Sequence, residues 1–349
     1  MSQLKRRGFL LGHIPEHQDQ ANDPKLWSQG YPVLLKGQCR DDLQSHSQNI
    51  KQTEKLVRAV LEEQSLDDVL AKAPYAQRLE PKFQSLGSVY DERDTREVET
   101  VIFDATSGDK IIAEDIWLKA SWLSLLDDDA SLRFRFSFGI DLEEDVALDP
   151  YRQQLSAELT DRIFPESGII TSDIDLWQKL KGVLGSDSVN FVERIIYFNA
   201  EGGGAYFHHD LERGHAGVVF AQLTGSTFWF ALPTWALIEE VIHFSETHPW
   251  PDSLTLEMRD EMDELVKNRP QLSLALHSFV NDSLIHLINE TKEFAQFLIS
   301  RGHSTQLHPG DVLLLPQKDE ASCCWHSVFC LGEEMGQALS FAIRAGDVG

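Results

Sequence analysis

Two short histidine-containing segments carry the side chains best suited to chemistry. In the first, Tyr206-Phe207-His208-His209-Asp210, His208 and Asp210 are two positions apart. Side chains two apart on a β-strand project from the same face, so this imidazole and this carboxylate would stand together. With one more histidine they form a two-histidine, one-carboxylate set, which holds Fe(II) and leaves open positions for a cosubstrate and O2. We take His326 in Trp325-His326-Ser327 as that third ligand, so the predicted catalytic iron ligands are His208, Asp210 and His326.

Three neighbouring residues are alternatives to these ligands. His209 replaces His208 if the strand register slips by one residue, but Asp210 then leaves the shared face. His215 follows in an expected loop, where it would contact substrate or act as a stand-in ligand. Cys324 lies two positions before His326, but a buried cysteine is more often a small apolar filler of a strand.

Short apolar segments with turn residues between them surround both histidine segments. Residues 192–199 are rich in β-formers, and residues 217–223 and 226–232 read as two strands joined at Thr224-Gly225. Later, a Pro-Gly-Asp turn leads into a strand ending at Pro316, and residues 327–331 and 337–345 flank a turn at 332–336. Such a run of short antiparallel strands is typical of a double-sheet jelly roll.

The order of these motifs resembles the JmjC/cupin-type oxygenases that depend on Fe(II) and 2-oxoglutarate. The resemblance covers roughly residues 190–345, with a gap in the middle. The residues that carry it are His208, Asp210, Gln222-Leu223-Thr224-Gly225, Pro309-Gly310-Asp311-Val312-Leu313, Pro316, His326 and Val328. The resemblance implies a hydroxylase (a dioxygenase) that uses Fe(II), O2 and 2-oxoglutarate as cosubstrate, and it implies release of succinate and CO2.

The chain departs from the family at the residue that binds the far carboxylate of 2-oxoglutarate. The family has a lysine there, and this chain has Thr227. Because a buried dicarboxylate needs a cation or several donors, we expect Arg344 to replace it. A hairpin folded about Met335 would set Arg344 opposite His326. Further candidates for binding the cosubstrate or the substrate are Thr227, Asn199, Tyr206 and Ser340, together with Tyr197.

Two other functions remain open. A metal-dependent cupin enzyme that does not use 2-oxoglutarate is supported by the missing lysine. In a non-catalytic jelly-roll binding module, the His-x-Asp pattern would be coincidental.

The predicted fold class is α+β, with a double-stranded β-helix (jelly-roll) core. Residues 1–95 form a mostly helical N-terminal region, and residues 96–233 and 303–349 form the oxygenase core. Residues 234–302 have helical periodicity and separate the metal-ligand strands, so we expect a helical insertion that serves as a lid, a substrate cap or a homodimer surface. Outside the ligand strands, residues 75–94 read as a loop, 116–126 as a helix, 131–139 as an alternating strand and 149–162 as a helix.

Charge and cysteine content limit the partners and the compartment. The chain has 31 Lys+Arg against 56 Asp+Glu, a formal net charge of −25. This balance argues against a nucleic-acid partner, and the substrate is expected to be a small molecule or a peptide or protein side chain. The twin arginines Arg6-Arg7 are not followed by an apolar segment, and no stretch is long and apolar enough to span a membrane. Four cysteines, three of them clustered at 323–330, form no disulfide framework in a chain this long, so we expect a cytoplasmic protein.

Overall fold

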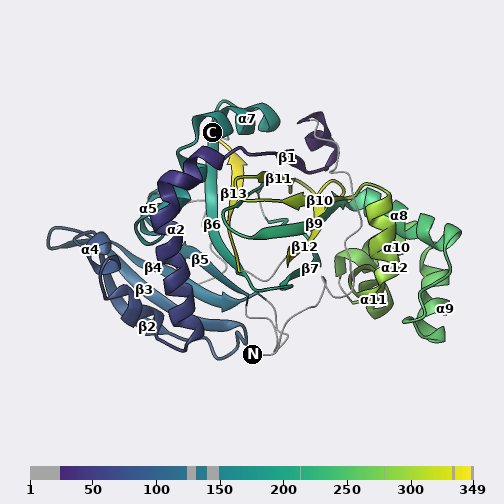
Figure 1. The fold of residues 1–349 in the computed structure, drawn as a ribbon, viewed down its shortest axis with the longest axis horizontal. Coiled ribbons are helices and arrows are strands. Elements are labelled where there is room, and N and C mark those ends of the chain that lie inside the picture. Colours follow the sequence, from purple (N-terminus) through teal and green to yellow (C-terminus); the bar gives the residue numbers. More distant parts are fainter. Residues whose placement is uncertain are drawn as a thin grey trace.

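The computed structural model describes residues 24–123, 131–139, 149–212, 214–278, 280–331 and 335–346. The expectations for Arg6-Arg7 and for most of the turn at 332–336 lie outside these residues. Two antiparallel sheets dominate the fold, and helices flank them on both sides (Figure 1). This mixed arrangement of helices and antiparallel sheets is consistent with a jelly-roll-like fold.

The larger sheet has nine strands in the order β1-β11-β8-β13-β6-β5-β4-β3-β2. Their bounds are β1 Val33–Leu35, β2 Phe83–Val89, β3 Glu97–Ser107, β4 Lys110–Trp122, β5 Leu132–Phe138, β6 Val189–Asn199, β8 Gly217–Gln222, β11 Val312–Pro316 and β13 Gly336–Ala345. The smaller sheet has the order β10-β9-β12-β7, with β7 Gly204–His208, β9 Ser226–Pro233, β10 Ser304–Leu307 and β12 Cys324–Leu331.

Helices gather in two groups. The first group, at the left and top of Figure 1, comprises α2 Arg40–Leu61, α3 Leu66–Leu70, α4 Tyr75–Leu79, α5 Pro150–Ile163, α6 Gly168–Thr171 and α7 Ile174–Leu184, with the 3-10 helices η1 Pro24–Gln29 and η3 Pro165–Ser167. The second group, green and at the right, follows β9 in the chain: α8 Thr234–Thr247, α9 Leu256–Leu265, α10 Arg269–Ser278, α11 Asp282–Glu290 and α12 Lys292–Ser300. None of the helices in the described ranges combines the length and the apolar character that a membrane crossing demands.

Strand alternation divides the apolar side chains among three cores. The space between the two sheets holds Val218 and Leu315 from the large sheet and Trp229 and Val328 from the small one. The outer face of the small sheet, with Phe230, packs against the second helix group. The other face of the large sheet packs against the first helix group. Because both faces of β9 and β12 are covered, these strands are buried along nearly their whole length.

Several local predictions are confirmed. The strand predicted at 131–139 is β5, with Leu132, Phe134, Phe136 and Phe138 buried. The helix predicted at 149–162 is α5, and Asp149 caps it by accepting a hydrogen bond from the Arg152 N–H at 2.9 Å.

Other predictions were wrong. The expected helix at 116–126 is strand β4 as far as Trp122, because its buried residues Ile116, Leu118 and Ala120 alternate with period two. The expected loop at 75–94 contains α4 and β2.

The two expected ligand hairpins are also absent. Strands β8 and β9 lie in different sheets, so the turn at Thr224-Gly225 crosses from one sheet to the other. Strands β12 and β13 are separated in the same way: β12 pairs with β7 and β9, and β13 pairs with β6 and β8. Position 344 is therefore not opposite position 326.

Candidate metal centre

Strand pairing brings the predicted ligands together. His208 is the last residue of β7 and lies directly opposite His326 of β12 in the antiparallel ladder. Asp210 follows two residues later. The Nε2 atom of His208 is 3.6 Å from Oδ1 of Asp210, and Nε2 of His326 is 3.4 Å from Oδ2. Donor atoms that each lie about 2.1 Å from one ion are about 3 Å apart at right angles, so this spacing fits a divalent metal.

Backbone carbonyl groups orient both imidazoles. Nδ1 of His208 lies 2.7 Å from the carbonyl oxygen of Tyr206, and Nδ1 of His326 lies 3.0 Å from that of Cys324. Because a carbonyl oxygen only accepts, each Nδ1 carries the proton and donates it. The lone pair of each ring is then on Nε2, the atom that faces Asp210, which is the tautomer that a metal site requires.

The protonation states also suit a cation. Burial and the nearby His326 lower the pKa of His208 to about 4. Burial opposes the ionisation of Asp210, but the imidazoles of His326 and His208 together hold the pKa of its carboxyl group far below its usual range. At neutral pH the site therefore contains neutral His208 beside the Asp210 carboxylate, which attracts a cation.

The ligands line a cavity between the two sheets. Its walls are mainly apolar, and Trp229 stacks on the His326 ring at 5.7 Å between ring centroids. Asn199 and Ser340, both predicted to bind the cosubstrate, line this cavity, and so does Tyr197. The side-chain oxygen of Asn199 is buried and has no hydrogen-bond partner among the described residues. An orphaned polar atom of this kind points to a bound molecule.

The remaining predicted cosubstrate residues lie elsewhere. Arg344 lines a separate, larger hollow beside Gly214 and His215. The Thr227 hydroxyl group is fully buried, donates to Oε1 of Gln222 at 2.7 Å and accepts from the Trp229 indole at 2.8 Å. Tyr206 is partly exposed and is not part of the cavity wall, although its carbonyl group accepts from His208.

None of the three alternative ligands belongs to the cluster that His208, Asp210 and His326 form. His209 points to the outer face of the small sheet. His215 is grouped with Glu193 and Glu212. Cys324 faces the space between the sheets as a buried filler, and burial raises the pKa of its thiol.

Sequence reasoning missed two features of the site. The first is Trp229, whose position four residues after Gly225 gave no sign that it would stack on His326. The second is Arg133, which lies opposite Tyr197 in the β5–β6 ladder. Its alternation with the buried phenylalanines was visible, but the neighbouring strand that carries Tyr197 was not.

No family model and no curated protein matches this chain. Among solved structures, it is similar to ycfD of E. coli at 16% identity and a TM-score of 0.28, over 95% of this chain and 55% of the other. A structure of YcfD, a ribosomal oxygenase from Escherichia coli, in complex with cobalt and succinic acid matches at 14% identity and a TM-score of 0.26, over 95% and 54%. The chain thus spans about half the length of the solved chains it matches.

These neighbours are oxygenases, as are the proteins that the sequence motifs resemble. TM-scores of this size add no weight to a functional assignment, which therefore depends on the geometry of the site.

Proposed function

We propose that the chain is an Fe(II)- and 2-oxoglutarate-dependent oxygenase, most simply a hydroxylase, with iron held by His208, Asp210 and His326. The observation that carries the proposal is the convergence of two Nε2 lone pairs and one ionised carboxylate on a single cavity. In this proposal the two sheets form a double-stranded β-helix. Residues 96–233 and 303–349 are its core, and residues 234–302 are an insertion that acts as a lid, a substrate cap or a homodimer surface.

Each protein group has a defined task at this site. His208 and His326 would present their Nε2 atoms to the ion, and Asp210 would supply the negative charge that offsets the cation. Trp229 holds the His326 ring in place, while Phe220 and Leu315 keep water from the cavity. When bound, Fe(II) with 2-oxoglutarate and O2 supplies oxidative decarboxylation to succinate and CO2, coupled to oxidation of a substrate C–H bond.

The 2-oxoglutarate contacts follow from the cavity wall. Asn199, Ser340 and Tyr197 offer neutral hydrogen-bonding groups. Burial raises the pKa of Tyr197 above its usual range, so its hydroxyl group keeps its proton and can donate. Arg133 lies directly opposite Tyr197, and its charge acts on that hydroxyl group. Arg133 is not itself among the residues that line the cavity, but it pairs with Tyr197, which is, and we therefore propose that Arg133 binds the far carboxylate in place of Arg344.

Anaerobic titration of the Fe(II)-loaded protein with 2-oxoglutarate tests this function. A saturable visible charge-transfer band is expected, and it should be absent in His326→Ala. Arg133→Gln should weaken 2-oxoglutarate binding about tenfold or more, as expected for loss of a charge-assisted contact. Arg344→Gln is the matched control and should bind normally. The opposite result for the two arginine variants would return the role to Arg344.

A metal-dependent cupin enzyme without 2-oxoglutarate is the second candidate. The observation that favours it is that no lysine or arginine is among the described residues lining the cavity. Iron binding with no charge-transfer band and no succinate formation would select it. A protein that folds but takes up no iron would instead be a non-catalytic binding module.

The proposal extends to the substrate and to the oligomeric state. We propose a small molecule or a peptide or protein side chain as the substrate, bound at the cavity that Asp210 lines. Association through residues 234–302 would give a homodimer.

A further inference from the structure

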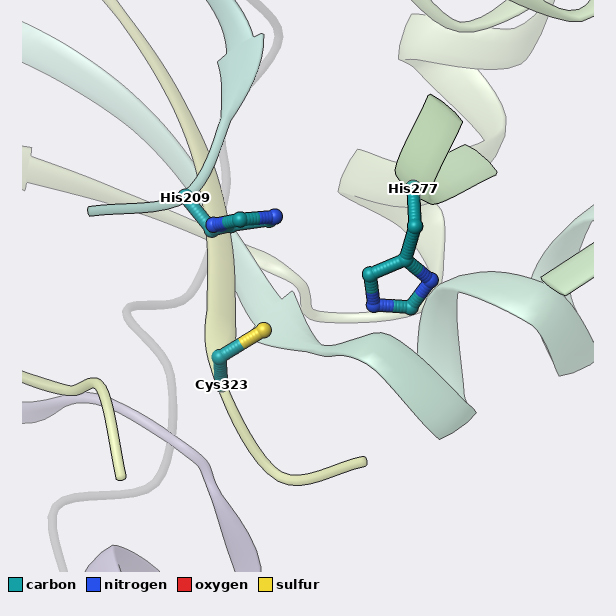
Figure 2. Close-up of side chains that lie close together, drawn as sticks. All are labelled: His209, His277 and Cys323. Atoms are coloured by element: carbon teal, nitrogen blue, oxygen red, sulfur yellow. The ribbon is translucent and has the colours of Figure 1, made fainter. Parts of the chain in front are cut away.

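A second group of potential metal ligands lies on the opposite face of the same sheet. His209, His277 and Cys323 come from three distant segments, and their ligand atoms all lie within 4.8 Å of one another. Figure 2 shows the tip of the His209 ring, the ring of His277 and the Cys323 sulfur atom facing a common space.

Strand alternation explains how this second group forms. His209 lies between His208 and Asp210, so its side chain projects to the outer face of the small sheet. Cys323 precedes β12 directly and is fully buried, with Sγ 3.2 Å from the Thr234 hydroxyl group. His277, in the last turn of α10, reaches the sheet from the helices on that face.

Hydrogen bonds and ring contacts fix the orientation of both imidazoles. Nδ1 of His277 is 2.9 Å from the carbonyl oxygen of Ser273, and Nε2 is 3.3 Å from that of Glu320. The shorter contact favours the proton on Nδ1, and Nε2 must turn from the Glu320 oxygen to bind an ion. Trp325 contacts both imidazoles edge to face, at 4.9 Å from His209 and 5.9 Å from His277 between ring centroids. Nδ1 of His209 accepts a long 3.3 Å hydrogen bond from the Leu211 N–H, so the neutral ring carries its proton on Nε2. Binding of an ion at Nε2 would move that proton to Nδ1 or to solvent and would break this long bond if it moves to Nδ1.

The donor set differs in chemistry from that of the first site. Two imidazoles and one thiolate prefer a borderline-soft ion of the zinc type, with a water in the fourth position of a tetrahedron. Burial raises the pKa of the Cys323 thiol, so this group keeps its proton until a metal ion displaces it.

We propose that His209, His277 and Cys323 form a second metal site, for a zinc-type divalent ion, which fastens helix α10 to the strands that carry the first site. The second metal site would add to an existing contact between the helices and the sheet on this face. There, the side chain of Asn289 in α11 accepts a hydrogen bond from the Phe207 N–H at 2.8 Å. This proposal does not depend on the function proposed above. No ligand of the first site contains sulfur, so a thiolate signal reports the second site alone.

Cobalt titration of the chelator-treated full chain tests the proposal. We expect a saturable near-ultraviolet thiolate-to-cobalt band whose final intensity corresponds to one thiolate-bound ion per chain. The band should disappear in Cys323→Ser and in His277→Gln. It should persist in Cys330→Ser, the matched cysteine control, and in His208→Ala, which disables only the first site.

Zinc binding and stability provide a second readout. Total zinc should fall from two equivalents to one in Cys323→Ser, and the rise in unfolding temperature on adding zinc should shrink in His277→Gln. Because His277 is partly exposed, its replacement keeps the test valid if Cys323→Ser fails to fold. A wild-type protein without a thiolate band, or a band that persists in folded Cys323→Ser, overturns the proposal. Loss of the 2-oxoglutarate band alone would leave it standing.

Discussion

The two faces of the four-stranded sheet make an instructive comparison. On the inner face, His208, Asp210 and His326 surround a cavity between the sheets with nitrogen and oxygen donors. On the outer face, His209 meets His277 and Cys323 under the second helix group, with nitrogen and sulfur donors. Three consecutive residues thus belong to two clusters of potential ligands, because successive side chains of an extended segment point in opposite directions.

The comparison shows that neighbouring histidines in one motif can belong to different clusters. Each ligand group depends on the β7–β12 pairing, but only the inner one places an ionised carboxylate between its imidazoles. The predictions below separate the two faces or disturb both at once.

The largest effect is expected from Asp210→Asn. This change removes the charged ligand, so 2-oxoglutarate turnover should fall by more than about 100-fold, because changes to groups that merely support a ligand already cost about 10–100-fold. Succinate release measures it. His277→Gln, on the outer face, should keep turnover within about threefold. Equal losses in the two variants would show that the faces are not independent.

Gly204→Ala should disturb both faces. A Cβ added at Gly204 would lie 2.1 Å from the backbone oxygen of Val328, so β7 must move away from β12. We expect a loss of about 2–4 kcal/mol in the free energy of unfolding, measured by urea denaturation. Gly87→Ala is the control, because an added Cβ meets nothing within 4 Å there although φ is +96°. Equal losses would mean that the clash with β12 is not the cause.

The inner face should also make stability depend on pH. His208 has a pKa of about 4 in the fold against 6.5 for the unperturbed group. Between these values the unfolded chain binds a proton that the folded chain refuses, so metal-free protein should lose stability as pH falls through this range. Urea midpoints at several pH values measure the slope. The slope should be smaller in His208→Ala, and an unchanged slope would assign it to other groups.

Thr227→Val should have the smallest effect. The substitution removes the hydroxyl group that links Gln222 to Trp229, which costs about 1–2 kcal/mol in the free energy of unfolding. Affinity for 2-oxoglutarate should stay within about threefold, as judged by titration. A tenfold loss of affinity would instead place Thr227 in contact with the cosubstrate.

Local sequence patterns predicted individual helices and strands more reliably than they predicted which of these elements contact one another. The Asp149-Pro150 cap and the alternation from Leu132 to Phe138 each predicted the right element, because capping and periodicity depend on residues close in the chain. The segment from Ile116 to Trp122 was assigned to a helix, because a short tryptophan-rich stretch suits both states and only its partners β3 and β5 decide between them.

Residue types and spacing were enough to predict the candidate ligand motif, since the two-residue interval in His208-His209-Asp210 determines which side chains share a face. The sequence did not predict which strands belong to which sheet. The assignment of β12 and β13 to different sheets depends on pairing with β7, β9, β6 and β8, and it separates Arg344 from His326. The meeting of His209 with His277 and Cys323 has the same origin. Strand alternation predicts that the side chain of His209 points to the outer face of the sheet. Which residues it contacts there is determined only by the packing of segments distant in the chain.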